Sequence, residues 1–229
     1  MKAYYYIFIY LFTGCAASYI PSPKNVPLFE EKGEARIEAG ISTNSIYATG
    51  SYAFSDKYAL ITNGTLSFLN FTPVSDLGAV LSFGLYDTGG MHRSIEAGLG
   101  RYNLLPSSVW RLETFAGVGY GTDGDEGKNK LQYLQEFVQT NIGKRFNKNE
   151  IGWALRIASI HEIPVEKIRI GVNIEPLIFM RFGGTHFNGF IRYGPSIMLP
   201  FSTSTGNNRY FFHYFFYFGH LSAGWSYRF

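Results

Sequence analysis

Residues 221–229, LSAGWSYRF, alternate strictly between two kinds of side chain. The larger or apolar set is Leu221, Ala223, Trp225, Tyr227 and Phe229. The small or polar set is Ser222, Gly224, Ser226 and Arg228. Because successive side chains of a β-strand point to opposite faces, this stretch predicts a strand with one apolar and one polar face.

The same period of two recurs through the chain upstream. It predicts ten strands, at residues 33–42, 45–54, 58–68, 91–102, 108–121, 130–145, 150–161, 166–181, 187–199 and 219–229. Residues 76–87 could form a further strand, so eight to twelve strands stay open. Residues 130–145 contain good helix formers, but Leu134, Val138 and Ile142 share even positions, which favours a strand.

Two solvents can explain such strands. In a soluble sandwich or barrel the apolar face is the core, whereas in a transmembrane barrel the apolar face meets lipid. The predicted segments are around ten residues or more, longer than most soluble strands. Their polar faces combine glycine and serine with isolated charges, and aromatic residues lie near their ends. We therefore expect an all-β fold, an antiparallel transmembrane β-barrel.

The connections between the predicted strands also suit such a barrel. With an even number of strands, both termini of the chain lie on the same side of the membrane. If the first strand starts in the periplasm, residues 103–107, 146–149 and 182–186 form short periplasmic turns. The longer connections, 69–90, 122–129 and 200–218, then face outward, as in bacterial barrels.

Composition excludes several other classes of protein. Hydrophobic residues make up 46% of the 229 residues and aromatic residues 18%, which argues against disorder. The net charge is only +3 and no basic block occurs, so we expect no nucleic-acid partner. The single cysteine excludes a disulfide scaffold.

The N-terminal residues are typical of an exported, lipid-modified chain. A basic start and the apolar run at 3–12 predict a signal peptide over residues 1–14. Thr13 and Gly14 precede Cys15 and resemble a lipobox, in which the cysteine is acylated. Cleavage of an ordinary signal peptide after Ala17 or Ser18 is the alternative. Residues 15–32 contain three prolines and no period, which predicts an extended, lipidated tether before a barrel at 33–229.

Several stretches together resemble the lipid-anchored outer-membrane β-barrel proteins of Bacteroidota. They are the box at Cys15, YIP at 19–21, NVPL at 25–28, EKGE at 31–34, YAF at 52–54, IEAGLG at 95–100, GVGYG at 117–121 and WSYRF at 225–229. The resemblance implies a location in the outer membrane, with membrane lipid and the barrel-assembly machinery as partners. Trp225, Tyr227 and Phe229 would form the assembly signal. Because residues 16–18 lack an acidic run, we expect the lipid anchor on the periplasmic side.

The polar strand faces carry charges that we expect inside the barrel. They are Arg36, Glu38, Glu96, Arg111, Glu113, Glu136, Arg156, Arg169, Glu175, Arg192 and Arg228. Such charges either form a constriction that selects solutes or a paired network that fills a narrow lumen. A barrel of eight strands is just filled by side chains, and ten strands add little room, so we favour the network.

We therefore expect a structural or narrow-conduit role and neither catalytic activity nor a cofactor. The five histidines lack the spacing of metal ligands, and we expect no metal site. One alternative is a lipid hydrolase in which His220 activates Ser222 on the same strand face. Another is a soluble periplasmic barrel that binds an apolar ligand; Trp110, Trp153 and Ile170 would then point inward.

Overall fold

A closed barrel of antiparallel strands forms the molecule. The structure, a computed structural model, describes residues 22–43, 45–67, 91–104, 109–123, 131–163, 169–202 and 215–229. Within these residues ten strands occur: β1 (Ala35–Ser42), β2 (Ser45–Tyr52), β3 (Tyr58–Ser67), β4 (His92–Leu104), β5 (Trp110–Asp123), β6 (Leu131–Phe146), β7 (Asn149–Ile163), β8 (Arg169–Gly183), β9 (Phe187–Ser202) and β10 (Phe215–Arg228). The ten predicted strands are confirmed, and the possible strand at 76–87 lies outside the described residues.

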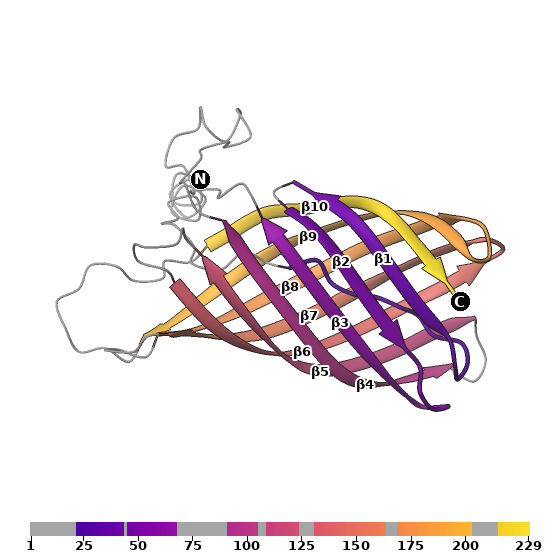
Figure 1. The fold of residues 1–229 in the computed structure, drawn as a ribbon, viewed down its shortest axis with the longest axis horizontal. Helices are drawn as coiled ribbons and strands as arrows, with labels where there is room; N and C mark the ends of the chain where they lie inside the picture. The colour runs from indigo at the N-terminus through magenta and orange to yellow at the C-terminus, as the bar shows by residue number, and fades with distance from the viewer. Residues whose placement is uncertain are drawn as a thin grey trace, which may run out of the picture.

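Each strand pairs with the next along the chain, and β10 pairs with β1 to close the barrel (Figure 1). In the closing pair Ala39 lies opposite Trp225 and Ile37 opposite Tyr227. The stretch Leu131–Phe146 is a strand, so the helix alternative is wrong. In the described residues no helix is long and apolar enough to cross a membrane.

The two ends of the barrel differ in their connections. We call the end at which β1 begins and β10 ends the short-turn end; its connections are 53–57, 105–109, 147–148 and 184–186. The opposite, long-loop end carries the connections 43–44, 68–91, 124–130, 164–168 and 203–214, which include the three longest connections of the barrel. This is the asymmetry expected from the sequence.

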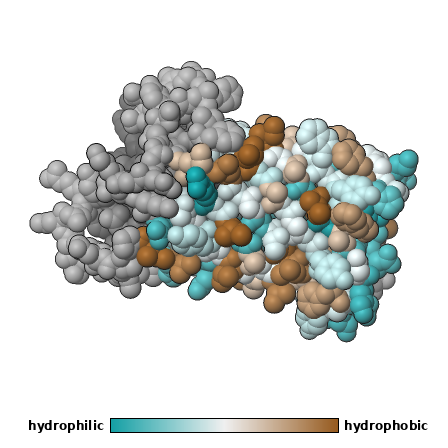
Figure 2. Space-filling view, viewed as in Figure 1, coloured by the Kyte–Doolittle hydropathy of each residue, from teal (hydrophilic) through white to brown (hydrophobic). Residues whose placement is uncertain are grey.

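The barrel wall is apolar outside and polar inside. Outward side chains such as Ile95, Val118 and Trp225 are 65%, 62% and 59% exposed. Inward side chains are mostly polar or charged and buried. Figure 2 shows hydrophobic residues spread over the wall, with hydrophilic residues gathered at the short-turn end. A soluble barrel has the opposite arrangement, so this is a transmembrane β-barrel.

Tryptophan positions agree with this orientation. Trp153 is 51% exposed on the outer face. The ring of Trp110, half-buried, stacks on it with a centroid separation of 6.0 Å. The side chain of Ile170 lies outside the described set. The tryptophans of the wall therefore face lipid, as expected for a membrane barrel.

Candidate functional site

The lumen is occupied by the chain's own N-terminal segment. Residues 22–29 are all buried, although they belong to no strand. They run along the inside of the barrel toward the short-turn end, visible as the indigo trace in Figure 1. The sequence predicted a tether lying between a lipid and the barrel. Instead, this part of the tether, which we call the lumen segment (residues 22–30), lies within the barrel.

Side chains of the wall satisfy the backbone of the lumen segment. A buried segment outside the β-sheet has no neighbouring strand to form backbone hydrogen bonds with, so its carbonyl groups need other donors. Asn63 donates to the Pro23 carbonyl at 2.7 Å, and Gln139 donates to the Asn25 carbonyl at 2.7 Å. Two arginines also donate to this backbone: Arg192 to the Lys24 carbonyl at 2.9 Å and Arg181 to the Val26 carbonyl. The segment is therefore fixed from several strands at once.

At mid-barrel the segment contributes to two charged groups. Lys24 Nζ lies 3.0 Å from Glu175 on β8. Ser22 donates to Glu96 on β4, which also forms an ion pair with Arg156 at 2.9 Å. All these side chains are buried, and burial makes pairing necessary because an unpaired buried charge costs several kcal/mol, about 3–5.

Glu38 forms a third group with two arginines. Arg181 donates to it through Nε at 3.1 Å and Nη2 at 2.7 Å, and Arg192 donates to its other oxygen. Each guanidinium also lies over an aromatic ring, at 5.2 Å from Phe179 for Arg181 and 4.3 Å from Phe190 for Arg192. These cation–π contacts orient the two planar guanidinium groups within the lumen.

A fourth group of charges lies at the short-turn end. Glu150 accepts from Arg36 at 3.0 Å, from Arg181 at 2.8 Å and from Arg145 Nε at 2.8 Å. Glu30, the last residue of the lumen segment, pairs with Arg111, Arg145 and Arg228. The segment thus ends in an ion-pair network across this mouth of the barrel.

Apolar contacts add to the fit of the segment. Leu28 and Val26 pack with Leu177 and Phe179 in one buried cluster. A Cβ added at Gly143 would lie 2.4 Å from Leu28 Cδ1, so this glycine leaves the space that Leu28 fills. Phe29 packs on Tyr102 with ring centroids 5.4 Å apart, and its amide donates to Glu113 at 2.7 Å.

The structure places most of the predicted charges in the lumen. The following are buried there: Arg36, Glu38, Glu96, Arg111, Glu113, Arg156, Glu175 and Arg192. Arg228 is half-buried at the short-turn mouth, and the side chain of Arg169 lies outside the described set. Glu136 is exposed on the outer face, so its predicted inward position is wrong. Glu136 lies on the same strand face as Leu134 and Val138, whereas Gln135 and Phe137 point inward.

Five charged residues of this network were not predicted: Lys24, Glu30, Arg145, Glu150 and Arg181. Arg181 lies on the same face of β8 as Glu175, and Glu150 lies on the same face of β7 as Arg156. The alternation of the sequence could therefore have predicted that both point inward. Lys24 belongs to an aperiodic segment and carries no such signal.

His220 and Ser222 both point into the lumen and are buried. Neither side chain faces the lipid that a hydrolase of this design would need to reach. Among the described residues no group of histidine, cysteine, aspartate or glutamate side chains could hold a metal ion. Trp225, Tyr227 and Phe229 are exposed on the outer face of the wall at the short-turn end, and Cys15 lies outside the described residues.

No protein-family model matches the sequence, and no curated protein is similar to it. Among solved structures the chain is similar to the outer membrane protease OmpT from Escherichia coli. The two are 8% identical with a TM-score of 0.46, over 86% of this chain and 93% of that one.

Proposed function

We propose that the protein is an outer-membrane β-barrel lipoprotein with a structural role, whose lumen is closed by its own N-terminal segment. The observation that carries this proposal is the lumen segment itself. It is bonded to β3, β6, β8 and β9 and ends in the charges of the short-turn mouth. A conduit of any width requires that this segment leave the barrel.

The space around the segment supports a sealed lumen rather than a narrow pore. A barrel of about ten strands is only slightly wider than one that side chains fill completely. The gap beside Asn25, Glu96 and Arg156 has no room for a water molecule. Closely packed ion pairs at this depth favour a closed lumen over an aqueous path for a solute.

Conductance in planar bilayers tests the proposal. The full-length protein, reconstituted from detergent, should give no steady current steps under applied voltage. An ion-conducting baseline in most insertions would contradict a sealed barrel and favour the conduit role. Heat-modifiable migration on gels gives the fraction of folded barrel in the same sample.

The direction of the lumen segment bears on the proposed lipid anchor. The chain runs from Ser22, at the depth of Glu96, to Glu30 at the short-turn mouth. Cys15 precedes Ser22 by seven residues, a reach of about 23 Å when extended. Half of a hydrocarbon core is about 15 Å. Residues 22–30 fill the lumen between Ser22 and the short-turn mouth. The direction of this segment therefore favours an acylated Cys15 on the long-loop side. This side is opposite to the one expected from the sequence.

Labelling with a clickable fatty acid tests whether the anchor exists, with Cys15→Ala as the unlabelled control. Protease added to intact cells then tests its side, using an epitope inserted directly after Cys15. Loss of the epitope from intact cells supports the long-loop side when that side faces outward. If the epitope is degraded only after the outer membrane has been permeabilised, the anchor lies on the periplasmic side.

A further inference from the structure

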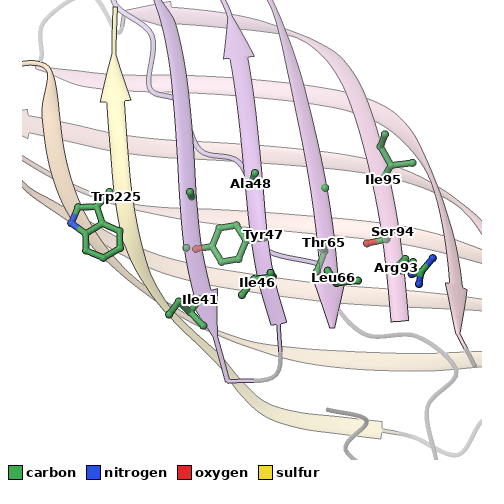
Figure 3. A pocket seen from close by; sticks show the side chains of 13 residues that line it. Ile41, Ile46, Tyr47, Ala48, Thr65, Leu66, Arg93, Ser94, Ile95 and Trp225 are labelled. Atoms are coloured by element: carbon green, nitrogen blue, oxygen red, sulfur yellow. The ribbon is translucent and has the colours of Figure 1, made fainter. Parts of the chain in front are cut away.

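The outer wall of the barrel contains a groove across β10, β1, β2, β3 and β4. It has a volume of about 670 Å³ and is lined mostly by apolar side chains (Figure 3). We call it the wall groove.

Strand register explains why the wall is hollow there. One row of paired residues runs Trp225, Ala39, Ala48, Gly64 and Ile95 across the five strands. Three small residues therefore lie between two large ones, which are 59% and 65% exposed. A Cβ added at Gly64 would meet nothing within 4 Å, so this position opens onto free space.

The next row toward the long-loop end ends in a cation. It contains Ile41, Ile46 and Leu66, with Arg93 opposite Leu66 on β4. Figure 3 shows these side chains along one edge of the groove. Arg93 is exposed on the lipid-facing side of β4, and its Nη2 contacts the sulfur of Met91 at 3.4 Å. Among the described residues no carboxylate forms an ion pair with it.

An arginine on the lipid-facing wall is stabilised when its guanidinium meets an anion at the level of the headgroups. Phosphate suits the planar guanidinium because it can accept two parallel hydrogen bonds. The small residues Ala39, Ala48 and Gly64 line the part of the groove nearer the membrane centre and offer contact area for acyl chains. The groove thus combines an anion contact at its long-loop edge with an apolar bed toward the membrane centre.

We propose that the wall groove binds a phosphorylated, multiply acylated glycolipid, with its phosphate on Arg93 and its acyl chains over Ala39, Ala48 and Gly64. The distance from Trp225 to Ile95 spans four strand spacings of about 4.8 Å, or about 19 Å. This width suits more acyl chains than the two of a phospholipid. The inference rests on the membrane insertion of the proposed function.

A second copy of the chain fits the groove less well. Two copies in one membrane share an orientation, so a symmetric contact through this groove brings the two Arg93 residues to the same depth. Like charges at close range near a low-dielectric surface repel each other. A lipid phosphate, by contrast, neutralises the single cation.

Binding is measured by native mass spectrometry of the full chain in neutral detergent. The added probe is a purified diphosphorylated hexa-acyl glycolipid, phosphatidylglycerol or phosphatidylcholine. Arg93→Gln and Gly64→Leu should each weaken glycolipid binding by about tenfold, since one removes charged hydrogen bonds and the other fills the bed. Arg101→Gln is the matched control, because Arg101 is exposed on the same face of β4 at the short-turn end.

Equal weakening by Arg93→Gln and Arg101→Gln would overturn the proposal in favour of general charge attraction. Phosphatidylglycerol bound as tightly as the glycolipid would overturn the glycolipid assignment. A lipid-free dimer that Gly64→Leu abolishes would assign the groove to a second copy. Insertion of the wild-type barrel into vesicles is scored separately, so a failure of the proposed function is distinguishable from a failure of lipid binding.

Discussion

Arg181 connects the Glu38 group, the charges of the short-turn end and the backbone of the lumen segment. It donates to Glu38, to Glu150 and to the Val26 carbonyl, and it is fully buried. Arg181→Met keeps most of the volume but leaves these acceptors short of a donor. We expect a loss of about 3–5 kcal/mol in the free energy of unfolding, measured by urea titration of the barrel in vesicles.

Lys57→Met provides the comparison for this loss, because Lys57 lies exposed in the turn between β2 and β3. It should change the free energy of unfolding by less than about 0.5 kcal/mol. Equal stability of Arg181→Met and the wild type would show that the buried ion pairs contribute nothing net.

The contact between Gly143 and Leu28 gives a second prediction for single residues. Gly143→Ala places a methyl group where Leu28 lies and should cost about 1–3 kcal/mol through overpacking. In the Leu28→Ala background the same change should cost much less, because the space is then free. A double-mutant cycle measures this coupling. Gly64→Ala is the control, since its added methyl meets nothing; additive effects at 143 and 28 would contradict the packing described.

At the scale of the elements, the proposed closure of the barrel by the lumen segment gives a prediction about conduction. Replacement of residues 22–29 by a glycine–serine sequence of equal length removes its side-chain contacts but keeps the connection. Water and ions should then enter around the exposed charges of Glu38, Glu96 and Glu175. We expect current steps in planar bilayers, with cation selectivity lower than in a purely acidic pore because arginines line the same lumen. A folded replacement variant that stays silent would show that wall side chains close the barrel alone.

The strands could be predicted from the sequence because one physical constraint, lipid outside and polar lumen inside, repeats in each of them. Ile151, Trp153 and Leu155 alternate with small residues in the sequence, and all three side chains are exposed on the outer face of the barrel. The predicted inward position of Glu136 is wrong, although Glu136 lies two residues after Leu134 and therefore on the same face of the strand. The lumen segment could not be found this way, because its contacts come from many strands that are far apart in the sequence and leave no period. Only its prolines marked it as extended.

At the scale of the whole molecule, the orientation of the wall predicts how the protein meets a bilayer. The chain has three tryptophans, and Trp153 and Trp225 are more than half exposed on the outer face. In vesicles with bromine-labelled acyl chains, their fluorescence should be strongly quenched, because bromine in the hydrocarbon region can contact both rings. A variant with Trp153→Phe and Trp225→Phe keeps Trp110, half-buried beside β6, and should be quenched less. A soluble barrel with an apolar core would stay in the supernatant with unquenched emission, and that outcome would overturn the membrane orientation on which the sealed lumen and the wall groove both depend.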